Sequence, residues 1–69
     1  MKFECIKGKA DSENVTVVVM QGDIVEYVST DEGEVVIIGI AGWCEGIELV
    51  FTPKEFVEHF KAIHLTYKI

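Results

Sequence analysis

Four side chains in this sequence are able to bind a soft metal ion: Cys5, Cys44, His59 and His64. The two histidines have the spacing of a zinc-finger pair, but the cysteines stand 39 positions apart, whereas such a site places them a few residues apart. We therefore expect no metal site. We interpret the cysteines as small buried hydrophobic residues and His59 as a solvent-facing residue of a helix. His64 is expected to be a linker residue or a cation at the helix C-terminus.

Covalent catalysis is not encoded either. A reactive cysteine needs a cationic setting that lowers its pKa, but Cys44 stands between Trp43 and Glu45. The sequence contains no Cys-x-x-Cys motif, no Ser/His/Asp arrangement and no phosphate-binding glycine loop. The acidic segment 31–34 lacks the ligand spacing of a calcium loop and indicates a charged hairpin tip. We expect a protein that is not an enzyme and has no cofactor.

Recognition is the chemistry that remains. Trp43, the only tryptophan, stands in the glycine-flanked loop Gly42–Gly46 beside Glu45, as an aromatic anchor bordered by acid would. The alternative is that its ring turns inward as the largest plug of the core, because large aromatic side chains are usually mostly buried. The candidate partner-binding residues are Trp43, Glu45, Tyr27, Glu26 and Glu34.

The charge distribution narrows the choice of partner. Twelve acidic residues oppose six lysines, giving a net charge of −6, and no lysine stands between Lys9 and Lys54. This interval predicts an anionic surface. Binding to nucleic acid requires cations that neutralise phosphates, so we expect no direct nucleic-acid binding. A basic protein partner fits the charge better.

The length and composition indicate one small domain, residues 1–69, in which 49% of residues are hydrophobic. A domain this small hides only about 60% of its unfolded surface. The apolar excess therefore fits either a dense monomeric core or a homodimer in which a second copy covers apolar surface. No apolar run has the length of a membrane span, and the N-terminal residues do not have the pattern of a signal peptide. We expect a cytoplasmic protein.

These residues must be positioned by short strands. Alternating or β-branched runs predict strands over residues 2–7, 15–20, 24–29, 34–41, 47–51 and 65–69, with a loop over 8–14. The run 15–20 is expected to be buried on much of both faces. Frequent turns favour a mainly β fold, either a small curled antiparallel sheet or an SH3-like barrel of five to six strands.

One short helix, about 53–62, is predicted before the last strand. Thr52 stands at the N-cap, Pro53 at the first helical position and Glu55 three residues after the cap, which is a capping box. Phe56, Val57, Phe60 and Ile63 share helical spacing and predict one apolar stripe that closes an open end of the barrel.

The segments 3–7, 22–27, 47–56 and 60–61 together give the chain a resemblance to short reading frames of phages and prophages in Gram-positive bacteria. The resemblance covers most of the chain and implies a bacterial host, but it implies no activity. We therefore hold two hypotheses. The first is a phage- or prophage-encoded module that binds a host or phage protein. The second is a structural domain that self-associates without an external ligand, through the run Val35–Ile40.

Overall fold

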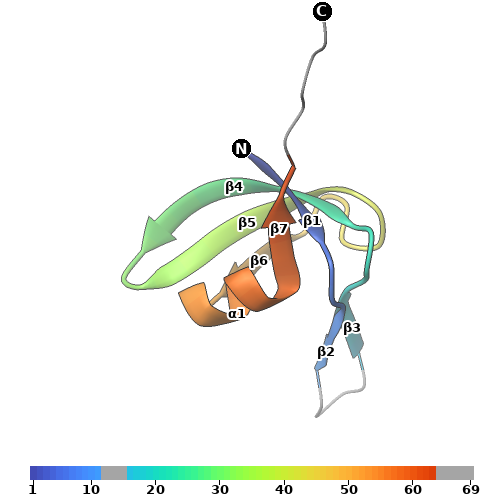
Figure 1. Ribbon diagram of the computed structural model, residues 1–69, viewed down its shortest axis with the longest axis horizontal. Helices are drawn as coiled ribbons and strands as arrows, with labels where there is room; N and C mark the ends of the chain where they lie inside the picture. Colours follow the sequence, from blue (N-terminus) through green and yellow to red (C-terminus); the bar gives the residue numbers. More distant parts are fainter. Residues whose placement is uncertain (12–15, 64–69) are drawn as a thin grey trace, which may run out of the picture.

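The strands of this protein form one main sheet and a smaller two-stranded ribbon (Figure 1). The computed structural model describes residues 1–11 and 16–63. In chain order its elements are β1 (Lys2–Cys5), β2 (Lys9–Asp11), β3 (Thr16–Val19), β4 (Ile24–Asp31), β5 (Glu34–Ala41), β6 (Glu48–Phe51), α1 (Pro53–His59) and β7 (Phe60–Ala62). The main sheet is antiparallel and has the order β6-β5-β4-β1-β7, while β2 pairs with β3. Within the described residues β6 and β7 do not pair with each other, so this sheet is open and is not a closed barrel.

The arrangement confirms the predicted mainly β fold, with one short helix before the last described strand. The prediction for residues 8–14 is wrong. The expected loop 8–14 contains β2, which pairs with β3 through Lys9, Ala10 and Asp11. A strand of three residues is too short for its alternation to be visible in the sequence. The predicted final strand, 65–69, lies outside the described residues.

The capping box predicted at the start of α1 is confirmed. The Thr52 hydroxyl accepts a hydrogen bond from the Glu55 amide at 3.2 Å, and the Glu55 carboxylate accepts one from the Thr52 amide at 3.2 Å. These contacts satisfy two amides that have no partner inside the helix. The cap therefore fixes the point where the chain turns from β6 into α1.

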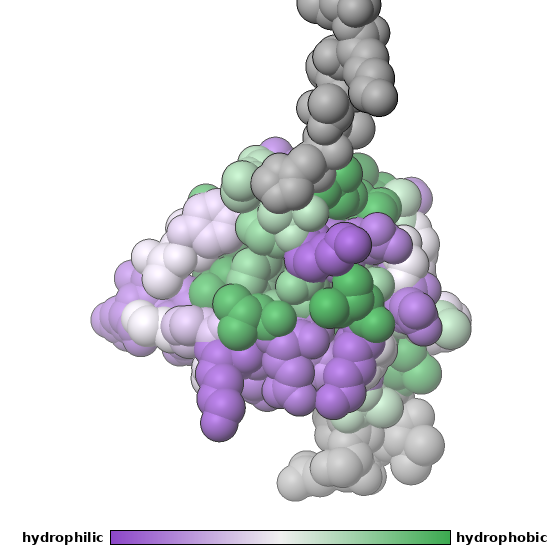
Figure 2. All heavy atoms as spheres, viewed as in Figure 1, coloured by the Kyte–Doolittle hydropathy of each residue, from purple (hydrophilic) through white to green (hydrophobic). Residues whose placement is uncertain are grey.

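The end of the helix differs from the prediction. The helix stops at His59, because Phe60 adopts an extended conformation (φ −131°, ψ 153°) and pairs with Cys5 of β1. The predicted stripe is also wrong at Val57, which is 71% exposed. Phe60 belongs to the core, but it reaches the core from a strand. Figure 2 shows apolar and hydrophilic side chains sharing the surface on the helix side of the molecule.

The helix covers an aromatic core on one face of the sheet. Phe60 packs edge-on against Phe51, with ring centroids 5.3 Å apart, and stacks on Phe56 at 5.2 Å. Phe3 of β1 meets Phe56 edge-on at 4.8 Å. These contacts join β1, β6, α1 and β7. The remaining buried apolar residues are Cys5, Val19, Val25, Val35, Ile37 and Cys44.

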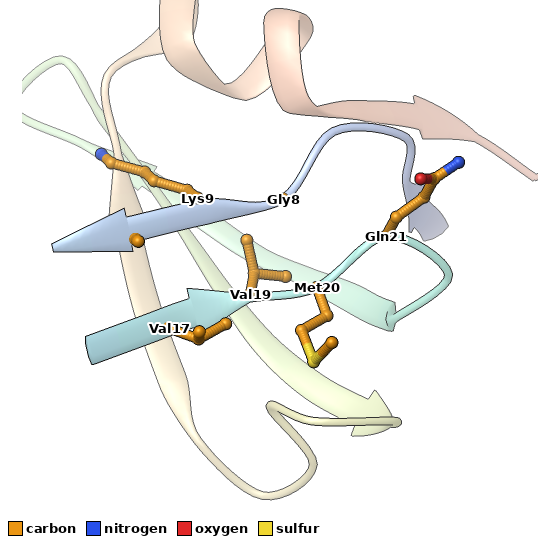
Figure 3. Close-up of a pocket in the computed structure, with 7 residues that line it drawn as sticks. Gly8, Lys9, Val17, Val19, Met20 and Gln21 are labelled. Carbon is orange, nitrogen blue, oxygen red and sulfur yellow. The ribbon is translucent and has the colours of Figure 1, made fainter. Parts of the chain in front are cut away.

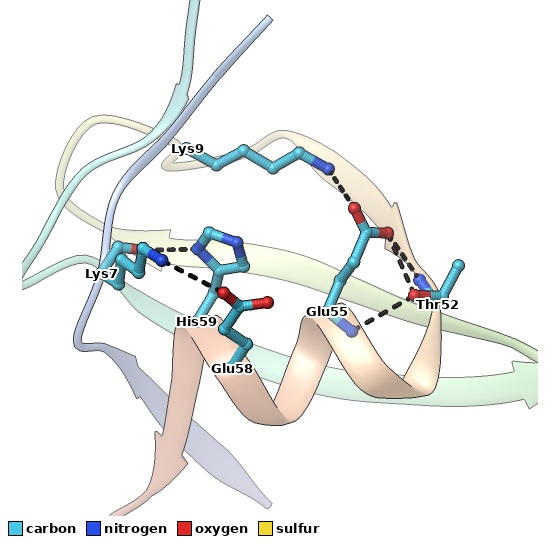
Figure 4. A network of polar contacts seen from close by, with 6 residues as sticks. All are labelled: Lys7, Lys9, Thr52, Glu55, Glu58 and His59. Atoms are coloured by element: carbon cyan, nitrogen blue, oxygen red, sulfur yellow. Dashed lines mark hydrogen bonds and ion pairs between the residues drawn. The ribbon is translucent and has the colours of Figure 1, made fainter.

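Two lysines near β2 connect this part of the chain to the helix (Figure 4). Lys9 forms an ion pair with Glu55 at 2.8 Å, and its ammonium lies 5.0 Å from the centre of the Phe51 ring. Lys7 forms an ion pair with Glu58 at 3.1 Å. Each of these lysines is therefore already matched to an acid of α1. In the described part of the chain, α1 is too short to cross a lipid bilayer.

Candidate recognition site around Trp43

The carboxylate of Asp23 organises the loop that carries Trp43. Asp23 is only 4% exposed. It accepts hydrogen bonds from three backbone amides: those of Trp43 at 2.9 Å, Met20 at 3.0 Å and Cys44 at 3.2 Å. Burial alone would raise the pKa of Asp23, but these hydrogen bonds stabilise the charged form and hold the pKa below its usual value. The carboxylate thus joins the turn before β4 to the loop between β5 and β6.

The loop reaches Asp23 because its glycines allow close approach. Gly42 has φ +99°, and a side chain at this position would collide with the Asp23 carboxylate. The carbonyl of Cys44 lies directly against Gly39 of β5, where a β-carbon would also collide. These two contacts fold the loop tightly over the end of β5 and place Cys44 in the core.

The indole of Trp43 lies at the surface in a fixed position. The side chain is 57% exposed, so it is not the core plug considered as the alternative. Its Nε1–H donates a hydrogen bond to the carbonyl oxygen of Val17 in β3 at 2.8 Å. Trp43 therefore links the main sheet to the β2–β3 ribbon. One edge of the ring is bound internally, and much of the ring is left accessible.

Two further exposed apolar residues are linked to Trp43, Val17 through its backbone carbonyl and Met20 through Asp23. Val17 is 37% exposed and Met20 is 47% exposed. Their positions correct the expectation that the strand over 15–20 is buried on much of both faces. With Trp43 they form what we call the Trp43 surface: Trp43, Val17 and Met20, held together by the Val17 carbonyl and by Asp23.

A shallow groove of about 310 Å³ continues from this surface over the β2–β3 ribbon. Its lining residues are Gly8, Lys9, Ala10, Val17, Val19, Met20 and Gln21. Figure 3 shows Lys9 and Gln21 extending in opposite directions at its two ends. Most of the lining is apolar, and the groove is large enough to hold one or two side chains.

The thiols do not supply a nucleophile to this site. Cys5 and Cys44 are fully buried and free, as the sequence predicted. Burial and the neighbouring Asp23 carboxylate raise the pKa of Cys44 to about 11. Burial also raises the pKa of Cys5, whose Sγ lies 3.1 Å from the Lys7 carbonyl. Both thiols therefore stay protonated near neutral pH.

The prediction that His59 faces solvent is wrong. It is buried, and its Nδ1 lies 2.7 Å from the Lys7 carbonyl oxygen. A carbonyl only accepts, so Nδ1 carries the hydrogen in this contact. The imidazole closes the junction between α1 and the segment after β1. Among the described residues there is no cluster of side chains able to hold a metal ion, and His64 lies outside them.

The structure brings together only part of the predicted site. Glu45 is exposed in the same loop as Trp43. Tyr27 lies in the middle of β4, where its hydroxyl contacts that of Thr30. Glu34 starts β5 at the hairpin tip, the end opposite to the Trp43 loop (Figure 1). Glu26 lies 3.3 Å from the N-terminal amine. Trp43 and Glu45 therefore share one loop, whereas Tyr27, Glu26 and Glu34 lie elsewhere on the sheet.

Three residues of the site were missed from the sequence: Asp23, Val17 and Met20. The signal available for Asp23 was a single acid between two apolar runs, directly after Gly22. No pattern marked the exposure of Val17 or Met20, because it depends on how the ribbon departs from the main sheet.

Comparison with protein-family models, with curated proteins and with solved structures gives no match to this chain.

Proposed function

We propose that this protein is a small protein-interaction module that binds a basic segment of a partner protein through the Trp43 surface. The proposal rests on the combination of exposure and fixed orientation at Trp43. Its ring is more than half exposed, yet its indole N–H and its backbone amide are both fixed by hydrogen bonds. A ring held in one orientation loses little entropy when a partner binds, which favours an anchor role.

Charge supports the basic character of the partner. Glu45 stands two residues from Trp43 and is exposed, and within the described residues it takes part in no ion pair. The nearest cation of the groove, Lys9, is already paired with Glu55. Because Nε1–H is bound to Val17, a partner meets the face of the ring and not its polar edge. A lysine or arginine side chain suits such a face through a cation–π contact.

The setting that we propose is a phage or prophage in a bacterial host, with the protein acting in the host cytoplasm on a host or phage protein. The resemblance to short phage reading frames supports the setting. The two free cysteines fit a reducing compartment.

The test is affinity capture from bacterial lysate with wild-type protein and three variants. Trp43→Ala removes the anchor and Glu45→Lys reverses the neighbouring charge. Val57→Ala alters an apolar residue on the helix side that is more exposed than Trp43. The expected partner is captured by wild type and by Val57→Ala, is lost with Trp43→Ala and Glu45→Lys, and is released by added salt.

Thermal melts by circular dichroism show whether each variant is folded. Glu45→Lys leaves the indole contacts intact, so it tests the surface even if Trp43→Ala loosens the loop. Capture that is equal for wild type and Glu45→Lys, or a partner that binds independently of salt, contradicts the proposed basic recognition.

A second candidate function is self-association through the outer face of the main sheet. Ile38 and Ile40 of β5 are each 38% exposed, and Val50 of β6 is 50% exposed, so three β-branched residues on adjacent strands meet solvent. Packing against a second copy would cover them. Sedimentation at micromolar concentration distinguishes the cases: a mass of 7.7 kDa excludes the homodimer, and twice that mass, lost with Ile38→Lys, supports it.

A further inference from the structure

The hydrogen-bond register of the main sheet shows which backbone groups β6 turns outward. The Gly39 amide donates to the Ile47 carbonyl at 2.9 Å, which fixes the register at which β5 and β6 exchange hydrogen bonds, although the Ile47 amide itself donates to Cys44. The pairs that follow at steps of two along the same ladder are Ile37 with Leu49 and Val35 with Phe51. In an antiparallel sheet the intervening residues point their amides and carbonyls away from the partner strand. On β6 these are Glu48 and Val50.

The two outward residues are accessible and lie on a short open edge. Val50 is 50% exposed and Glu48 is exposed. No other described strand pairs with this side of β6. The next outward amide, that of Thr52, is already bound to Glu55 in the capping box. The open part of the edge is therefore limited to Glu48 and Val50, which we call the β6 edge.

The opposite side of the sheet is less open. On β7 the amide of Ile63 donates to the Lys2 carbonyl, so Phe60 and Ala62 are the residues that point outward. The Phe60 amide already donates to the Phe56 carbonyl at the end of α1. Of the two outer strands of the main sheet, β6 thus offers the larger set of outward backbone donors and acceptors.

The geometry points to strand addition at the β6 edge: an extended segment of a partner protein pairs with Glu48 and Val50, with a basic residue opposite Glu48 and an apolar residue opposite Val50. Extended peptides bind sheet edges in this way, with affinity from the main chain and specificity from alternate side chains. The two positions share the outer face of the sheet, so the segment has the pattern basic-x-apolar or its reverse. This site is separate from the Trp43 surface and does not rest on the function proposed for it.

The charge of Glu48 favours a basic segment over a second copy of this chain as the partner of the β6 edge. In a two-fold pairing about Leu49, Glu48 of one copy would face Val50 of the other, and the two Glu48 side chains would lie diagonally on the same face. Like charges at neighbouring cross-strand positions are unfavourable, and each copy carries a net charge of −6. A lysine or arginine opposite Glu48 removes this cost and adds a favourable cross-strand pair.

The test uses two synthetic peptides and isotope-labelled protein. The first peptide is acetyl-Ser-Thr-Val-Thr-Lys-Thr-Ser-amide, and the second has glutamate in place of lysine. The lysine peptide is expected to shift the NMR signals of the Glu48 and Val50 amides and to slow their hydrogen exchange. The Leu49 amide, already bonded to β5, is expected to change little. The glutamate peptide is expected to bind at least about fivefold more weakly, and Glu48→Lys to reverse this order.

Two matched changes test the backbone contact itself. Val50→Pro removes one outward N–H without removing a β5–β6 hydrogen bond, and edge positions tolerate proline. This variant is expected to lose peptide binding. The control variant Val57→Ala is expected to retain it. If Val50→Pro does not fold, the peptide supplies the same test. N-methylation of its valine and lysine is expected to abolish binding, and N-methylation of the threonine between them to preserve it. The proposal is overturned if both peptides bind equally, or if the NMR signals that shift on peptide addition lie outside β6. It is also overturned if the Glu48 and Val50 signals shift with rising protein concentration in the absence of peptide.

Discussion

The Asp23 carboxylate lies in the space that a side chain on residue 42 would need, and Gly42 keeps that space open. Asp23 ends the turn before β4, and Gly42 begins the loop after β5. The contact lets Asp23 accept the amides of Trp43 and Cys44. A buried acid and a glycine far apart in the chain therefore set the position of the exposed indole.

The first prediction concerns Gly42→Ala. Residue 42 has φ +99°, and its added β-carbon would collide with Asp23, so we expect the free energy of unfolding to fall by about 3 kcal/mol or more. Gly46→Ala is the matched control. Gly46 also has positive φ, but open space surrounds it, so only backbone strain of about 1 kcal/mol applies. Urea denaturation measures both; equal losses would show that the Asp23 contact is unimportant.

The second prediction concerns Asp23→Asn. The amide side chain is neutral and has only one accepting oxygen, so all three backbone amides lose a charged acceptor and at least one of them loses its acceptor altogether. We expect a loss of about 1–3 kcal/mol at neutral pH. The folded pKa of Asp23 lies below the ordinary value of 3.8, so the stabilisation is fully present above 3.8 and is lost as pH falls through the folded pKa.

The difference between wild type and Asp23→Asn should therefore be constant above about pH 5 and shrink below the ordinary carboxyl pKa. Urea denaturation across this range measures it. A difference that stays constant into strong acid would mean that the charge of Asp23 does not contribute.

The third prediction concerns Glu55 and Lys9. The hydrogen bond from Lys9, followed by the contacts with Thr52, lowers the pKa of Glu55 to about 2. Lys9→Met removes the largest of these causes and keeps the apolar length of the side chain. The Glu55 pKa, measured by NMR titration of its carboxyl carbon, is expected to rise toward 4.5. Any stabilisation from Glu55 is present above 4.5 and is lost as pH falls toward 2.

Lys7→Met is the control for this titration, since Lys7 is paired with Glu58. It should raise the pKa of Glu58, which is otherwise lowered by the Lys7 hydrogen bond, and leave Glu55 unchanged. A Glu55 pKa that is unaffected by Lys9→Met would show that the capping box alone holds it low.

The fourth prediction compares Phe60 and Val57. Phe60 is buried between Phe51 and Phe56, so Phe60→Ala leaves a cavity and is expected to cost about 3–5 kcal/mol. Val57 is 71% exposed, and Val57→Ala should change stability by less than about 0.5 kcal/mol. Thermal melts measure both. Similar melting temperatures for the two variants would contradict the placement of Phe60 in the core.

Local signals in the sequence identified much of the fold. The capping box at Thr52 and Glu55 gave the start of α1, since it depends only on residues three positions apart. β-branched runs gave the long strands β4 and β5. The end of α1 was missed because Phe60 is held by pairing with Cys5, a contact that helical spacing does not reveal. Helical spacing also predicted Val57 in the core and His59 in solvent, whereas the structure has Val57 exposed and His59 buried.

The sequence by itself determined a small, acidic, mainly β protein with one capped helix and with cysteines in its interior. Composition and short-range patterns carry that information, because alternation and capping act between near neighbours. Only the tertiary structure decided that Trp43 faces solvent, that Asp23 holds its loop, and that β6 has an open edge. Each of these depends on contacts between residues far apart in the chain, and the sequence contains no local pattern that records them.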